Sequence, residues 1–137
     1  MKYKYNDGGR EQAGYKGNAR DCVTRAISIA SGLPYKQVYK DINSLAKEMR
    51  VECGARTGVP KTVYAKYLDE LGFEWVPTMR IGSGCKVHLV DSELPTGKII
   101  VRLSRHLCAV VDGVINDTYD CSRGGSRCVY GYWIKGE

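Results

Sequence analysis

Cys22 stands at the start of a helix-like stretch, where a thiol could serve as a nucleophile. Apolar residues recur after it at the spacing of one helix face: Val23, Ala26, Ile27 and Ala30. This spacing predicts a helix over about residues 22–31, with Gly32 as its C-terminal cap. Asp21 is the expected N-cap, with its carboxylate accepting a hydrogen bond from a first-turn amide. The unpaired amides and the helix dipole at that end favour a thiolate at Cys22.

A cysteine nucleophile usually works with a histidine base, and His106 is the better placed of the two histidines. His106 opens an apolar strand that runs into Asp112-Gly113, a strong signal for a two-residue hairpin turn. With that turn, His106 and Asp117 project from the same face as diagonal neighbours, roughly 7–8 Å apart at the backbone. Asp117 is therefore predicted to orient the imidazole. A longer turn or a bulge would substitute Asn116, which otherwise points to the other face.

The remaining histidine and cysteines have plainer interpretations. His88 lies in the middle of a short strand, with no acidic residue at a comparable offset, and is predicted to be a half-buried sheet histidine. Cys108 shares a face with His106 but sits inside an apolar strand, which favours a small buried side chain. Cys53 and Cys85 lie in or beside loops with no evident base. A core position for Cys22 also stays open, since free cysteines are often buried.

The order of elements predicts an α+β fold in a single domain of 137 residues. Residues 1–20 are polar and glycine-rich and are expected to form an N-terminal arm or loop. Residues 21–72 form the helical half, and residues 73–137 form an antiparallel β-sheet half, with one cleft between the two. The expected helices cover about 22–31, 34–50 and 60–71. The expected strands are 73–77, 86–90, 98–103, 106–111, 114–120 and 128–134.

The charge balance favours acidic partners in general. The chain has 21 Lys and Arg against 15 Asp and Glu, a formal net charge of +6. The basic residues are dispersed and no aromatic RNA-binding signature is present, so a nucleic-acid accessory role is the weakest of the alternatives. The N-terminus lacks the apolar stretch of a secretory signal, and no window approaches the ~18 apolar residues of a membrane span. We therefore expect no membrane association and a cytoplasmic location, in the host if the chain is phage-encoded.

In a reducing compartment all six cysteines are expected to be free thiols. They are Cys22, Cys53, Cys85, Cys108, Cys121 and Cys128. They include no C-x-x-C pair and make no metal-ligand pattern with the histidines, so no metal and no cofactor are predicted. Cys121 and Cys128 flank a Gly-Gly loop, which leaves a disulfide or half a metal site open there.

Two motifs, NARDCVTRAISIASG and RHLCAVVDGVINDTYD, resemble the papain-like cysteine peptidase superfamily. The closer likeness is to small bacterial and phage members near the bacteriocin-processing peptidases. The resemblance covers most of residues 17–135 and implies a papain-like fold. It also implies that Cys22 is the nucleophile, that His106 is general base and then acid, and that Asp117 holds the imidazole tautomer.

The family commonly places a Gln six residues before the cysteine, as a donor to the oxyanion. Lys16 stands there in this chain. Asn18 is the best substitute and Gln12 a weaker one, and the backbone amide of Cys22 is expected to contribute.

These observations predict an acyl-transfer enzyme, with hydrolysis of an amide bond in a peptide or protein substrate as the leading reaction. A transferase or deamidase would use the same three residues. The main alternative is a papain-like binding module without turnover, such as a small effector or inhibitor. The Lys16 substitution and the ten tyrosines suit that alternative.

Overall fold

A computed structural model describes residues 1–17 and 19–135 of the protein. The helices are α1 (Cys22–Ser31), α2 (Tyr35–Glu48) and α3 (Lys61–Glu70), with a short 3-10 helix at Asp91–Glu93. The strands are β1 (Lys2–Tyr5), β2 (Phe73–Pro77), β3 (Val87–His88), β4 (Lys98–Leu103), β5 (His106–Val111), β6 (Val114–Asp117), β7 (Cys128–Val129) and β8 (Gly131–Lys135).

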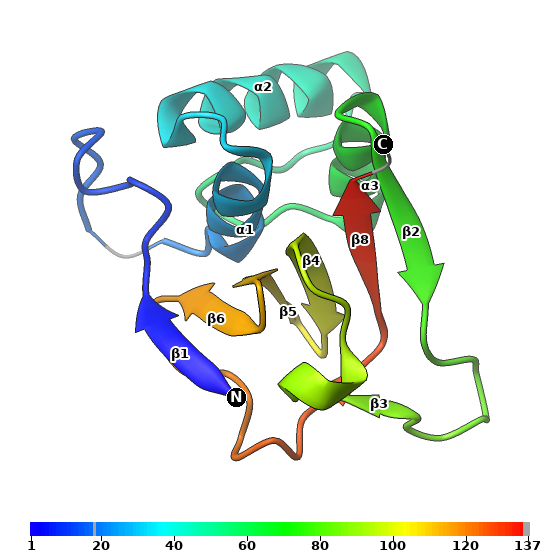
Figure 1. The fold of residues 1–137 in the computed structure, drawn as a ribbon. Coiled ribbons are helices and arrows are strands. Elements are labelled where there is room, and N and C mark those ends of the chain that lie inside the picture. The colour runs from blue at the N-terminus through cyan, green and yellow to red at the C-terminus, as the bar shows by residue number, and fades with distance from the viewer. Residues whose placement is uncertain (18, 136–137) are drawn as a thin grey trace.

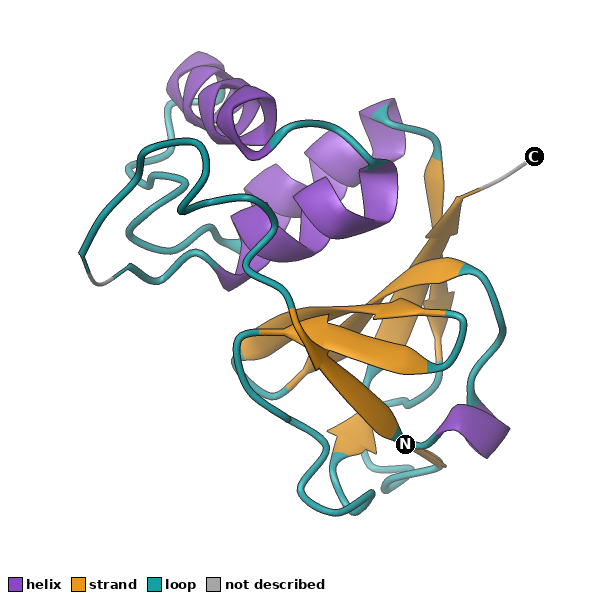
Figure 2. Ribbon diagram, turned by 60° about the vertical axis from the view of Figure 1, so that its left-hand side comes forward, coloured by secondary structure: helices purple, strands orange, loops and turns teal. Residues whose placement is uncertain are grey.

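The three helices lie on one side of the main sheet, with α1 in contact with the sheet and α2 farther out (Figures 1 and 2). The sheet has the strand order β1-β6-β5-β4-β8-β2, and β3 and β7 form a separate two-stranded sheet. The α+β class and the three helices are therefore confirmed. The position of α1 against β5 sets the site, because Cys22 begins one of these elements and His106 begins the other.

The helices begin and end close to the predicted residues. α1 spans Cys22–Ser31, and Gly32 closes it in the left-handed conformation with φ of 78°. Pro34 and Pro60 each directly precede a helix, where a missing backbone N–H costs nothing. The α2 helix ends slightly before the predicted Arg50. Its apolar stripe faces the core through Val38, Ile42 and Leu45.

The main sheet is mixed, which corrects the prediction of an antiparallel sheet. Residues 2–5, predicted to belong to an N-terminal arm or loop, form β1, which pairs in parallel with β6 from Lys2↔Val114 to Tyr5↔Asp117. The other pairings in the sheet are antiparallel. All four residues of β1 are exposed, as suits an edge strand, and the short stretch KYKY does not indicate which strand it pairs with.

The β5–β6 hairpin has the predicted register. Asp112 and Gly113 form the turn with φ of 48° and 78°, as a type I′ turn requires. The pairs Val111↔Val114, Val110↔Ile115 and Ala109↔Asn116 each sum to 225, so the predicted register is confirmed. This register brings Asp117 to the same end of the hairpin as His106.

Apolar residues fill both faces of the sheet. On the helical side, Ile100 and Leu107 pack with the helix residues Ile27 and Leu68. On the other side, alternate residues of β4 and β5 form a second cluster under the long loops: Ile99, Val101, Leu103, Cys108 and Val110, together with Leu89, Ile115, Cys121 and Val129. Burial on both faces makes β4 and β5 rigid supports for residues at their ends.

Cys85 and Cys128 form a disulfide, with their Cα atoms 5.8 Å apart. The expectation of six free thiols is therefore wrong for this pair, and the partner of Cys128 is not Cys121. The bond links the loop before β3 to β7, and the pairing of β3 with β7 is what brings the two cysteines together. Among residues 1–17 and 19–135, no helix has the length and apolar character needed to cross a membrane.

Candidate active site

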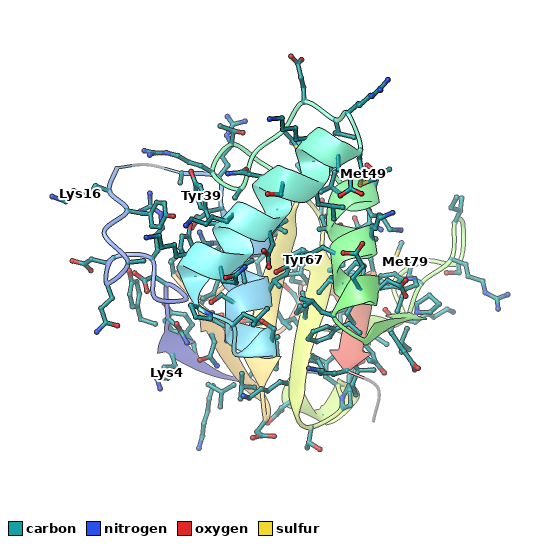
Figure 3. The ribbon with its side chains drawn as sticks, turned by 90° about the horizontal axis from the view of Figure 1, so that it is seen from above. Lys4, Lys16, Tyr39, Met49, Tyr67 and Met79 are labelled. Atoms are coloured by element: carbon teal, nitrogen blue, oxygen red, sulfur yellow. A yellow bond between two sulfur atoms is a disulfide. The ribbon has the colours of Figure 1, made fainter. Side chains whose placement is uncertain are left out.

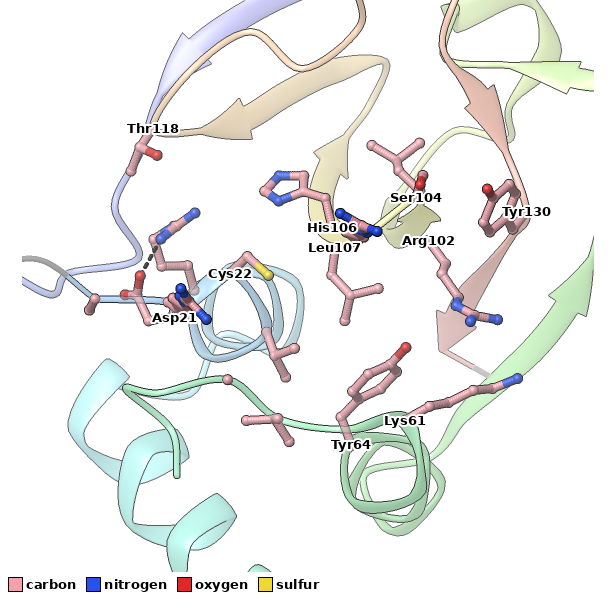
Figure 4. A pocket seen from close by; sticks show the side chains of 18 of the residues that line it. Asp21, Cys22, Lys61, Tyr64, Arg102, Ser104, His106, Leu107, Thr118 and Tyr130 are labelled. Carbon is pink, nitrogen blue, oxygen red and sulfur yellow. Dashed lines mark hydrogen bonds and ion pairs between the residues drawn. The ribbon is translucent and has the colours of Figure 1, made fainter. Parts of the chain in front are cut away.

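A cleft of about 820 Å³ lies where the start of α1 meets the start of β5 (Figure 4). Cys22 and His106 both line this cleft, and the sulfur of Cys22 points toward its middle. Tyr64 on α3 and Arg102 on β4 face it from the opposite side. Cys22 is half-buried and in contact with the helical core, so its side chain is supported while its sulfur remains accessible from the cleft.

His106 and Asp117 are in direct contact. Nε2 of His106 lies 2.6 Å from Oδ2 of Asp117, and the two side chains are 8% and 3% exposed. Asn116 instead bonds Asn6 and its own strand, so the two-residue turn selects Asp117 as the sequence predicted. A hydrogen bond at Nε2 fixes the ring and leaves Nδ1 for a second partner.

Cys22 and Cys121 are the two thiols close enough to the His106 ring to act on its pKa, and of these Cys22 lines the cleft. Burial acts to raise the pKa of Cys22, but the hydrogen bonds with His106 and with the amide of Leu107 outweigh it and lower the pKa. Burial acts to lower the pKa of His106, whereas the bond to Asp117 and the neighbouring sulfurs raise it to about 11. Both shifts favour a thiolate beside an imidazolium.

Arg25 connects this group to the start of α1. Its guanidinium binds Asp21, four residues earlier on the helix, and reaches Oδ1 of Asp117 at 3.2 Å. Burial acts to raise the pKa of Asp117, but the bond to His106 and the charge of Arg25 contribute to lowering it. Asp117 therefore remains a carboxylate and can hold both cations.

Asp21 does not cap α1 with its side chain, which corrects that prediction. Its carboxylate accepts hydrogen bonds from Arg25 and, at 2.8 Å, from the hydroxyl of Tyr35, and it lies 3.6 Å from Arg10. Hydrogen bonds to charged groups are stronger than a bond to a neutral amide, so the buried carboxylate turns toward them. Asp21 thus helps to hold Arg25 in place.

Cys121 lies next to His106, a contact that was not predicted from the sequence. Its sulfur lies within 4.8 Å of the ligand atoms of His106 and Asp117. The Cys108 and Cys121 thiols interact with one another, which lowers the pKa of Cys121 and raises that of Cys108. Both residues are 1% exposed, as predicted for Cys108, and neither lines the cleft. Cys22 is therefore the thiol that a substrate could reach.

The cluster of His106, Asp117 and Cys121 has the composition of a metal site, but its geometry fits hydrogen bonding better. Asp117 already accepts from the His106 ring at 2.6 Å and from Arg25 at 3.2 Å. A cation there would displace one of these bonds and lie beside the guanidinium charge. We therefore interpret the cluster as the support of the His106 ring.

Gln12, one of the side chains predicted to stabilise an oxyanion, does not line the cleft. Gln12 is exposed and lines a separate depression near the start of α2, and Asn18 lies outside the described residues. Lys16 stands at the outer edge of the N-terminal loop (Figure 3). Among the described residues, the amide of Cys22, in the first turn of α1, is the predicted donor that lies at the cleft.

The other candidates lie away from the cleft. His88 is half-exposed, with Nδ1 3.5 Å from Glu93, an acidic partner that the sequence analysis did not identify. Cys53 is a half-buried free thiol, and burial raises its pKa. Neither residue lines the cleft that holds Cys22. Searches of this chain against protein-family models, curated proteins and solved structures return no match.

Proposed function

We propose that this protein is a papain-like cysteine enzyme that transfers an acyl group, with hydrolysis of an amide bond in a peptide or protein as its reaction. One observation carries the proposal: an accessible thiol at a helix start shares a cleft with a histidine that Asp117 holds at 2.6 Å. The lowered pKa of Cys22 and the raised pKa of His106 add support. The cytoplasmic location stays a prediction.

The proposed reaction has two halves. The Cys22 thiolate attacks the carbonyl carbon and forms a C–S bond, and the oxyanion develops near the amide of Cys22. The C–N bond then breaks, and the leaving amine takes its proton from His106. In the second half, neutral His106 removes a proton from water, which attacks the thioester. The C–S bond breaks, which restores the thiolate and the protonated ring.

Competitive alkylation with iodoacetamide at neutral pH tests whether Cys22 is activated. Cys53 provides an internal reference because it is also half-buried and free, while its pKa is raised. We expect Cys22 to react at least about ten-fold faster than Cys53, because each unit of pKa below that of a reference thiol gives up to ten-fold more thiolate. His106→Ala should remove the preference, and His88→Ala should leave it unchanged.

A peptidyl epoxide then tests for the acyl-transfer geometry, with covalent capture measured by intact mass. The native protein should be captured at Cys22, and Cys22→Ala should not be captured. Slow, equal alkylation of Cys22 and Cys53, with no capture, would contradict the enzymatic proposal.

A papain-like binding module without turnover is the second candidate. It is favoured by one observation: Gln12 and Lys16 lie away from the cleft, so neither supplies the expected oxyanion donor. In that case the cleft would bind a polypeptide without cleaving it, and the alkylation experiment separates the two candidates.

A further inference from the structure

The wall of the Cys22 cleft carries an excess of positive charge. Its lining includes five cationic side chains and one carboxylate: Arg20, Arg25, Lys61, Arg102 and Arg105, against Asp21. Arg25 and Asp21 bind one another. Among the described residues, no carboxylate lies within 4.0 Å of the other four cationic groups. The cleft therefore presents positive charge that a ligand could complement.

Arg102 is the best-positioned of these cations. It lies on β4, a strand buried on both sides, and its own side chain is half-buried. The guanidinium stands 5.8 Å from the centre of the Tyr130 ring, and its charge opposes the burial that raises the pKa of the neighbouring Tyr64 hydroxyl. A guanidinium held in this way binds a carboxylate with little further loss of side-chain freedom. Its place across the cleft from Cys22 suits a side chain near the reacting carbonyl (Figure 4).

Lys61 extends the positive wall next to Arg102. It is the first residue of α3, and its Nζ lies 5.3 Å from the centre of the Trp75 ring. Figure 4 shows Lys61 and Arg102 on the same side of the cleft, beyond Tyr64. Two cations on one wall favour a ligand with negative charge at a defined distance from Cys22 rather than a neutral polypeptide.

We propose that the cleft selects polypeptides with an acidic side chain, Asp or Glu, beside the scissile bond, and that Arg102 is the main determinant. This inference rests on the proposed function. An acidic peptide is favoured over a nucleic acid because the cations surround a single cleft of about 820 Å³. That volume accommodates a few side chains of an extended peptide.

The test compares two peptidyl fluoromethyl ketones that differ only by Glu or Gln at the residue bearing the reactive ketone, whose side chain stands beside the position of the scissile bond. The measured quantity is the second-order rate of covalent labelling at Cys22. We expect the Glu probe to react about ten-fold faster at low salt, as a charge-assisted hydrogen bond predicts. Arg102→Gln should bring the Glu/Gln ratio close to one. Arg80→Gln, in an exposed loop outside the cleft, should leave the ratio unchanged.

Iodoacetamide distinguishes failure of this inference from failure of the proposed function. Fast alkylation of Cys22 with equal rates for the two ketones would overturn the acidic preference alone. A Glu preference that persists in Arg102→Gln would overturn the role of Arg102. A thymidine dodecamer is the last comparison: if it protects Cys22 from iodoacetamide at a lower concentration than a Glu-rich peptide does, the cleft is a nucleic-acid site and the inference is wrong.

Discussion

The Asp117→Asn substitution should lower the pKa of His106 without removing the contact between the two side chains. Asp117 is the first of the interactions that raise the pKa of His106 to about 11, and burial opposes them. An asparagine of nearly the same shape keeps one acceptor but loses the charge. With the charge gone, burial should favour the neutral ring more strongly than it does in the native protein.

The size of the change follows from the hydrogen bond between Nε2 and Oδ2, 2.6 Å apart and almost fully buried. A hydrogen bond to a charged group contributes about 1.5–3 kcal/mol. At 1.36 kcal/mol for each unit of pKa, the pKa of His106 should fall by about one to two units. The neutral ring would then form at a lower pH. The protonated imidazole, which is the acid that protonates the leaving amine, would therefore be lost at a lower pH than in the native protein.

Nitrogen-15 NMR of the imidazole rings measures this directly, because the chain has two histidines and His88 supplies the second signal. Asp120→Asn is the matched control. Asp120 is exposed, and it accepts hydrogen bonds from Ser122 at 3.0 Å and 2.7 Å. Native His106 titrating near pH 6.5 would refute the reasoning. So would equal titration curves for the Asp117→Asn and Asp120→Asn variants.

Three further predictions concern the free energy of unfolding. Between about pH 6.5 and 9, Cys22 and His106 together hold one proton in both the folded and the unfolded chain. The difference in unfolding free energy between the native protein and the Cys22→Ala/His106→Gln double variant should therefore not change with pH in that range. From pH 9 toward 11, Cys22 and His106 keep a proton only in the folded protein. Below pH 6.5, the two residues bind one proton more in the unfolded chain than in the folded protein. The difference in urea-unfolding free energy should therefore fall in both directions, by up to ~1.4 kcal/mol per pH unit. Gly131→Ala should destabilise by about 1–3 kcal/mol in urea unfolding, because its Cβ would stand 2.2 Å from the Trp75 ring; an unchanged midpoint would contradict the packing. Cys85→Ser removes a disulfide that spans 43 residues and should cost about 2–4 kcal/mol by calorimetry, with no loss if the bond does not form.

The helices and the β5–β6 hairpin were predictable because their signals are local. The apolar spacing after Cys22 and the Asp112-Gly113 turn each determine structure within a few residues. The contact between His106 and Asp117 followed from that turn, since the two residues are 11 apart in the chain.

The features that were not predicted depend on long-range contacts without a compositional signal. The β1 strand pairs with β6 more than a hundred residues away, through a backbone ladder and a hydrogen bond from the Tyr3 hydroxyl to the carbonyl of Asp117. The Cys85–Cys128 disulfide depends on the pairing of two-residue strands, too short for period-two alternation to show. Arg25 left a signal that could have been used: it lies four residues after Asp21, the spacing of an ion pair on a helix.

Arg25 also explains why predictions made from short stretches of sequence were enough to locate a site formed by both halves of the chain. His106 and Asp117 come from one hairpin and Cys22 from one helix, so a single packing contact, α1 against β5, has to bring them together. Arg25 fixes the register of that contact, because it binds Asp21 beside Cys22 and Asp117 beside His106. A buried guanidinium between two carboxylates has few alternative arrangements of similar energy. Arg25 therefore ties the start of α1, which carries Cys22, to the hairpin that carries His106.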